Sequence, residues 1–145
     1  MKHFVLAAAA LFLIHSVDAS AEGRARVGGA RANAQGGVTA GSAAAASGPN
    51  GGQAARAGAF QRNADGSGTR TGGFAASGTQ GNVASTGSAT RNADGSVSGL
   101  RQTSASAASG ETYNGQTTYD STSGVSHTGT CTDANGNVVT CPKPQ

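Results

Sequence analysis

The sequence predicts a mostly β protein made of short strands, with a turn about every 15 residues after an N-terminal export signal. Three observations lead to this fold class. Turn-forming Asn, Asp and Gly residues recur at a regular spacing, the segments between them are rich in Thr, Ser, Ala and Val, and large apolar side chains are scarce. Two architectures fit this spacing: a short-strand meander, and a two-sided β-solenoid with one coil per repeat of about 15 residues.

Residues 1–21 are predicted to be a cleavable signal peptide. Lys2 and His3 precede an unbroken apolar run, Phe4–Ile14. This run is too short to span a bilayer, which takes about 20 helical residues, but it has the length of a signal-peptide centre. The small residues Ala19–Ala21 place the cleavage before Glu22, with a cut after Ala19 as the alternative. We therefore expect an exported chain that meets a membrane only through this segment, during export.

Residues 22–58 form a low-complexity segment of Gly, Ala and Ser. Its stretch 40–48 shows no alternation of apolar and polar residues and has no bulky side chain, so little apolar burial opposes the chain entropy. We expect this N-terminal part of the mature chain to be disordered. Two turn signals fall within it, Asn33 with Gly36 and Asn50 with Gly51.

Residues 59–145 are predicted to be a β-repeat region. Its clearest copies, residues 62–67 and 91–96, share the sequence Arg-Asn-Ala-Asp-Gly-Ser. Asn and Asp tolerate left-handed backbone, and glycine adopts it without a steric penalty, so each such marker predicts a turn. The predicted turn residues of this region are Asn63, Asp65, Gly66, Gln80, Gly81, Asn92, Asp94, Gly95, Asn114, Gly115, Asn135 and Gly136.

Three further glycines lie halfway between the markers: Gly58, Gly73 and Gly87. We expect them to form return turns at the opposite edge of the structure. The strands would then be only about four to six residues long.

The C-terminal hairpin is the sharpest local feature. Cys131 and Cys141 flank the Asn135-Gly136 turn signal, and an exported chain with two cysteines is expected to join them in a disulfide. Pro142 and Pro144 then end the strand, because proline cannot donate to a ladder of backbone hydrogen bonds.

Composition and charge exclude several functions. The 24 glycines and the low content of large apolar residues leave too little to build a two-layer core. The formal net charge is +3, and the arginines are scattered singly along the chain. Nucleic-acid binding requires a basic patch with stacking aromatics, so we expect no nucleic-acid partner.

No residue pattern predicts a catalytic site, a cofactor or a metal. His127 is the only histidine of the mature chain, and no nucleophile motif surrounds it, so an exposed strand histidine is expected. Asn63 and Asp65-Gly66 match part of a calcium loop, but Gln61 and Gly72 stand where that loop needs acids. Turn formation explains these residues without an ion.

Three segments carry a resemblance to known proteins: Gly48–Gly51, Arg91–Gly99 and Cys131–Pro142. In these segments the chain resembles a group of small secreted bacterial Gly/Thr/Asn-rich repeat proteins that have no established activity. It is more loosely similar to the curlin-type amyloid subunits, from which its 15-residue period differs. The resemblance covers about residues 48–142 and implies export and repetition.

Two functions fit these expectations. The first is a non-enzymatic secreted or surface-associated repeat protein, a matrix or adhesion component that associates with itself or with a cell-surface polymer. The alternative is a secreted or periplasmic binding module whose strands pair with a partner or a polysaccharide.

Overall fold

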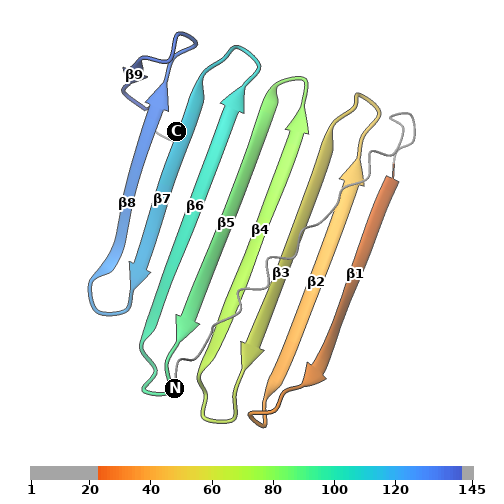
Figure 1. Ribbon diagram of the computed structural model, residues 1–145, viewed down its shortest axis with the longest axis vertical. Coiled ribbons are helices and arrows are strands. Elements are labelled where there is room, and N and C mark those ends of the chain that lie inside the picture. The colour runs from red at the N-terminus through yellow and green to blue at the C-terminus, as the bar shows by residue number, and fades with distance from the viewer. Residues whose placement is uncertain (1–22, 142–145) are drawn as a thin grey trace, which may run out of the picture.

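The computed structural model describes residues 23–141, which form one antiparallel sheet of nine strands (Figure 1). Each strand pairs with the next along the chain, so the spatial order equals the chain order and the topology is a meander. The strands are β1 (Gly23–Ala32), β2 (Val38–Ser47), β3 (Gln53–Arg62), β4 (Gly68–Gly78), β5 (Gly81–Arg91), β6 (Val97–Ala107), β7 (Thr112–Asp120), β8 (Gly124–Thr132) and β9 (Val138–Val139). The predicted fold class is confirmed, and the meander is the correct one of its two architectures.

The sheet is a single layer. No helix and no second sheet covers either face within residues 23–141. Of these residues only Cys131 and Ser85 are buried, so the described part of the chain has no hydrophobic core. The ladders of backbone hydrogen bonds between adjacent strands therefore hold the fold together, as the shortage of large apolar side chains requires.

One glycine with positive φ belongs to each of the eight turns: it lies within the connection in six of them, and it is the first residue of the next strand at Gly81 of β5 and Gly124 of β8. In the six connections that contain it, this glycine donates its N–H to the carbonyl three residues earlier, and the residue there donates its own N–H to the carbonyl of the residue after the glycine. This is the pattern of a three-residue hairpin loop, a type I turn followed by a left-handed residue. The six pairs are Asn33 with Gly36, Gly48 with Gly51, Asn63 with Gly66, Asn92 with Gly95, Ala107 with Gly110, and Asp133 with Gly136.

Most predicted turns lie where the sequence placed them. The predicted glycines that have positive φ are Gly36, Gly51, Gly66, Gly81, Gly95 and Gly136. Two turns were missed, at Gly110 and Gly124, because each of these glycines follows a serine, whereas the predicted turn glycines follow Asn, Asp or Gln.

Other predicted turns are wrong. Asn114 and Gly115 lie inside β7, paired with Ser104 and Thr103 of β6. Gly58, Gly73 and Gly87 lie within β3, β4 and β5 and form no return turns. The physical reason is strand length. A strand of 9 to 11 residues and its turn fill one 15-residue period, so one repeat is one strand and not two.

The expected disorder of the segment 22–58 is also wrong for residues 23–58. The structure describes this segment from residue 23, and it forms β1, β2 and the first part of β3. β1 pairs with β2 over the full length of both strands, and β2 pairs with β3 in the same way. Small side chains suffice because this sheet has no core to fill, and Gly36 and Gly51 supply the two turns.

The predicted signal peptide, residues 1–21, lies outside the described residues, as do Pro142 and Pro144. Within the described part of the chain, no helix has the length and apolar character needed to cross a membrane.

Candidate functional site

The strand registers assign every strand side chain to one of two faces. Successive side chains of a strand point to opposite faces, and residues paired across strands point to the same face. Arg56 pairs with Phe74, Phe74 with Ser85, and Ser85 with Thr103, so these four residues share one face. We call it the arginine face, because all but one of the arginines lie on it: Arg24, Arg26, Arg56, Arg62, Arg70, Arg91 and Arg101. The opposite face, which we call the threonine face, carries Arg31.

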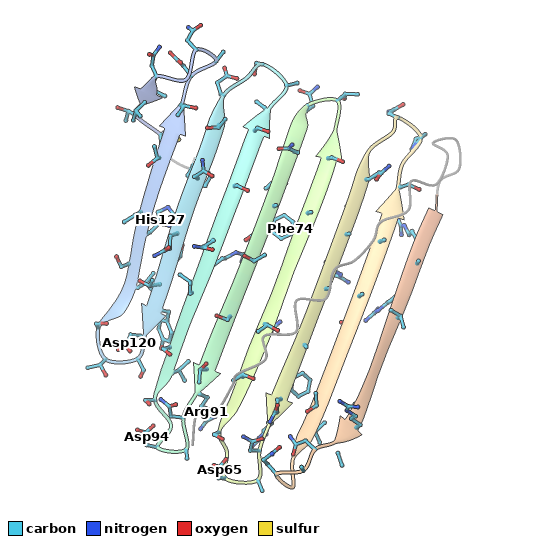
Figure 2. The ribbon with its side chains drawn as sticks, in the orientation of Figure 1. Asp65, Phe74, Arg91, Asp94, Asp120 and His127 are labelled. Carbon is cyan, nitrogen blue, oxygen red and sulfur yellow. A yellow bond between two sulfur atoms is a disulfide. The ribbon has the colours of Figure 1, made fainter. Side chains whose placement is uncertain are left out.

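The positive charge of the arginine face is not neutralised by neighbouring acids. Four acidic residues lie in hairpin turns at the ends of the strands, where Figure 2 shows Asp65 and Asp94. Asp120 ends β7 and belongs to the threonine face, since it pairs with Ser98. Among residues 23–141 no arginine forms an ion pair with a carboxylate. The arginines are scattered along the sequence, but the pairing register of the strands brings them to one face of the sheet. The sequence analysis did not predict this shared face.

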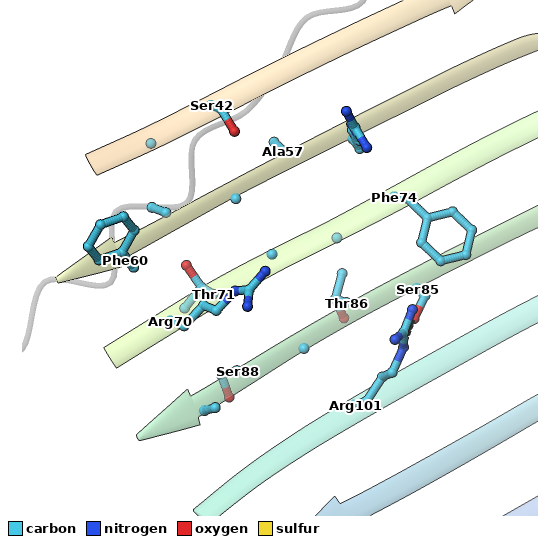
Figure 3. Close-up of a pocket in the computed structure, with 18 of the residues that line it drawn as sticks. Ser42, Ala57, Phe60, Arg70, Thr71, Phe74, Ser85, Thr86, Ser88 and Arg101 are labelled. Atoms are coloured by element: carbon cyan, nitrogen blue, oxygen red, sulfur yellow. Dashed lines mark hydrogen bonds between the residues drawn. The ribbon is translucent and has the colours of Figure 1, made fainter. Parts of the chain in front are cut away.

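A groove crosses the arginine face at right angles to the strands (Figure 3). Its floor consists of Gly58, Gly72 and Gly87 on three adjacent strands, which pair with one another in turn. Because glycine has no side chain, this row of three glycines forms a depression between the side chains on either side of it. The opening measures about 1090 Å³ and is open to solvent along its length.

Cationic and aromatic side chains form both walls of the groove. Phe60 and Arg70 are paired on one side of the glycine row, and Arg56 and Phe74 are paired on the other. The two phenylalanines are 47% and 39% exposed, so their rings are available for contact with a ligand. Each wall thus offers one guanidinium and one ring, on β3 and β4.

Arg101 closes the end of the groove on β6 and is held in place. Its Nε donates to Ser85 Oγ at 2.9 Å, and its guanidinium carbon lies 5.8 Å from the centre of the Phe74 ring. Ser85 is 3% exposed, and its hydroxyl also lies 3.0 Å from Gln102 O and 2.9 Å from Thr103 Oγ1. These contacts leave the terminal guanidinium nitrogens of Arg101 without a hydrogen bond among the described residues.

In the Asn-Ala-Asp-Gly-Ser turns the aspartate and serine side chains bond within the turn. Asp65 Oδ1 accepts hydrogen bonds from Ser67 N at 2.9 Å and Ser67 Oγ at 2.7 Å, and Asp94 is bonded in the same way to Ser96. The serine hydroxyl, followed by the serine N–H, holds the pKa of each carboxyl below its ordinary value of 3.8. Within residues 23–141 no three His, Cys, Asp or Glu side chains are close enough to hold a metal ion together.

His127 lies exposed on β8, on the arginine face, as expected for a strand histidine (Figure 2). Its Nδ1 is 2.8 Å from Thr117 Oγ1, and its Nε2 is 3.1 Å from Tyr113 OH. The Tyr113 ring lies over Gly115 and Gly129, whose added Cβ atoms would meet it. This arrangement explains why Gly115 lies in a strand: the ring of Tyr113 covers the space that its missing side chain leaves.

The predicted disulfide is present between Cys131 and Cys141, with a Cα–Cα distance of 5.3 Å. Cys131 is 7% exposed and pairs with Val139 of β9. The disulfide is consistent with an extracellular or periplasmic location, where disulfides persist.

No protein-family model, curated protein or solved structure matches the chain. Its function is therefore inferred from the geometry of the sheet, its edges and its arginine face.

Proposed function

We propose that the chain is a non-enzymatic, exported structural protein of the cell surface or the extracellular matrix, whose copies join edge to edge into a polymer. The observation that carries this proposal is an open antiparallel sheet that has a long exposed strand near each edge. The disulfide and the predicted signal peptide support export.

The first open edge is β1. All ten of its residues are exposed, and among the described residues it pairs with β2 alone. An unpaired strand edge presents N–H and C=O groups to any other strand. Val27, which is 68% exposed, adds an apolar contact at the middle of this edge.

The second open edge is β8. β9 pairs with it only at Cys131 and Thr132, so residues 124–130 have no partner strand on that side within the described chain. The disulfide holds β9 at one end of the edge and leaves the rest accessible. β8 and β1 run in opposite directions (Figure 1). A second copy placed with its β1 beside β8 would therefore continue the antiparallel sheet.

Charge favours this head-to-tail contact over a contact between two β1 strands. β1 carries Arg24, Arg26 and Arg31, so pairing it with itself would bring like charges together. β8 has no Lys, Arg, Asp or Glu and accepts β1 without this penalty. A contact from β8 to β1 leaves one free edge at each end, so it propagates into a fibre instead of stopping at a dimer.

The test is assembly of the purified protein at high concentration. We expect sedimentable polymer whose fibre diffraction shows a strand spacing of about 4.8 Å. The double variant Val125→Lys/His127→Lys adds positive charge on the side of β8 that belongs to the arginine face, where Arg24 and Arg26 of β1 also lie, and it should raise the concentration needed for assembly by about tenfold or more.

The matched control is Val125→Glu/His127→Glu, which changes the same exposed positions but attracts Arg24 and Arg26 of β1, so it should assemble readily, unlike the lysine variant. Circular dichroism of both variants checks that the sheet is intact. A natural chain that remains monomeric at high concentration, or stops at a dimer, would contradict the proposal.

A further inference from the structure

We propose that the groove on the arginine face is a binding site for a linear acidic polysaccharide, whose carboxylates pair with Arg56, Arg70 and Arg101 while its sugar rings lie on the glycine floor. The site is independent of edge-to-edge assembly, since it lies on the face of the sheet and uses no residue of β1 or β8.

The shape of the groove fits one extended chain of sugars. The wall residues lie two positions on either side of the glycine row, which separates the two wall rows by about 13 Å between backbones. The wall side chains fill part of this distance, and the space that remains between the two walls is wide enough for one polysaccharide chain lying flat. The groove crosses strands that are about 4.8 Å apart, close to the length of about 5 Å that one sugar adds to an extended chain. Successive sugars can therefore meet equivalent positions on successive strands.

The charges of the groove fit a regularly spaced anion. Arginine offers a planar fork of N–H donors that matches a carboxylate, and such charge-assisted pairs are stronger than neutral hydrogen bonds. No acidic side chain lines the groove, so nothing within it competes for the guanidinium groups. Arg101 is already oriented by Ser85 and Phe74, which reduces the side-chain entropy that binding would cost.

The aromatic rings fit the apolar part of such a ligand. Sugar rings present C–H faces that pack against aromatic side chains, and Phe60 and Phe74 offer half-exposed rings from opposite walls. The glycine floor lets a ring approach the backbone, because Gly58, Gly72 and Gly87 have no Cβ to hold it away.

A polysaccharide fits this groove better than a nucleic acid. Bases bound to a single-strand site stack on successive aromatic side chains, whereas Phe60 and Phe74 lie in different rows of the sheet and on opposite walls. The disulfide is also consistent with a location outside the cytoplasm, where acidic polysaccharides are available.

The experiment measures binding of dilute, monomeric protein to polygalacturonate by calorimetry, while assembly is followed separately in ligand-free protein. We expect binding that weakens with salt and is lost when the same polymer is fully methyl-esterified, because esterification removes the carboxylate charges. Arg70→Gln and Arg56→Gln should each weaken binding by about fivefold or more. Phe60→Ala should weaken it without changing the salt dependence.

The matched control is Arg31→Gln, which removes the same charge from the threonine face. It should change the affinity by less than about twofold, the effect of net charge alone. Equal losses for Arg31→Gln and Arg70→Gln would overturn the site, since binding would then depend on net charge. Absence of binding to polygalacturonate, or tighter binding of single-stranded DNA of equal charge, would also overturn it. None of these outcomes depends on whether the ligand-free protein polymerises.

Discussion

At the scale of single residues, the turn glycines direct the path of the chain. Gly66 has φ of +83°, a conformation in which an L side chain is strained, yet an added Cβ would meet no atom within 4 Å. Gly29 in β1 has equally open space around its Cβ position but no positive φ. A substitution at Gly66 therefore tests backbone strain alone, and the same substitution at Gly29 is a control without that strain.

We expect Gly66→Ala to lower the free energy of unfolding by about 1–2 kcal/mol, the usual cost of left-handed backbone in a residue with a Cβ. Gly29→Ala should be neutral or slightly stabilising, because alanine restricts the unfolded chain. Urea unfolding of both variants, followed by circular dichroism, measures the difference. Equal stabilities would show that the hairpin does not depend on left-handed backbone at Gly66.

The turn carboxyls give the protein a defined dependence on acid. Hydrogen bonds from Ser96 favour the ionised form of Asp94 and place its pKa below 3.8 in the folded state. A folded-state pKa below the unfolded value means that the stabilisation is complete above 3.8. It is lost as the pH falls below 3.8 and through the folded-state pKa, because the unfolded chain then binds the proton more readily.

Ser96→Ala removes the strongest of these hydrogen bonds, so the pKa of Asp94 should rise toward 3.8. Asp65 has the same environment at Ser67 and provides an internal control that should not change. Titration of the side-chain carboxyl carbons by NMR measures both values in one sample. A parallel shift of Asp65 and Asp94 would assign the effect to the whole fold instead of this hydrogen bond.

At the scale of elements, the sequence predicted the positions of turns better than the lengths of strands. Asn63 and Asn92 mark turns because their local chemistry requires them, and local chemistry is visible in a single sequence. Gly58 and Gly72 resemble turn residues by type, but they face each other within paired strands. That pairing depends on register, which no local signal at these glycines reveals.

The candidate groove could not be predicted from the sequence either, because it also depends on the strand register. Arg56 and Arg70 are separated along the chain, and only the pairing of β3 with β4 puts them on one face. The alternation of side chains along each strand could have assigned both arginines to one face, but only if the strand boundaries had already been known. The disulfide, in contrast, was predicted because Cys131 and Cys141 flank a local turn.

The C-terminal hairpin is an element that depends on its disulfide. β9 has two residues and two paired positions, too few to hold it against β8 by backbone hydrogen bonds alone. Closing a loop of this length restricts the unfolded chain by roughly 3 kcal/mol in the entropy model.

On reduction, or in Cys141→Ser, we expect residues 133–140 to lose protection from hydrogen exchange while β3 to β6 keep theirs. Exchange measured by mass spectrometry distinguishes these segments in one experiment. Loss of protection throughout the sheet would instead show that the hairpin is needed for the whole fold.

At the scale of the whole molecule, the stabilising contacts of the sheet join only strands that are adjacent in the chain. Each strand contacts only its neighbours in the chain, and no core connects distant strands among the described residues. The stability of such a protein is approximately a sum over strands and the interfaces between them. We therefore expect that a pair of adjacent strands can be deleted without disrupting the others, provided that the two strands that become neighbours keep the same pairing register.

Residues 63–91 contain such a pair: a turn, β4, the next turn and β5. In the intact chain Arg62 pairs with Gly68 across one Asn-Ala-Asp-Gly-Ser turn, and Arg91 pairs with Val97 across the other. Deleting residues 63–91 would join Arg62 directly to the second turn. Arg62 would then pair with Val97, and both side chains would remain on the arginine face, so the register and the two faces would be preserved.

We expect this deletion variant to fold as a sheet of seven strands with the same circular dichroism per residue and with lower stability, because two strands and their interfaces are lost. Hydrogen exchange should show unchanged protection in β2 and β7, which keep both of their neighbours. The variant also lacks Gly72, Phe74 and Arg70, so it should lose the groove while keeping both sheet edges. An unfolded or aggregated variant would show that strands far apart in the sheet stabilise one another, contrary to the nearest-neighbour contacts of the single layer.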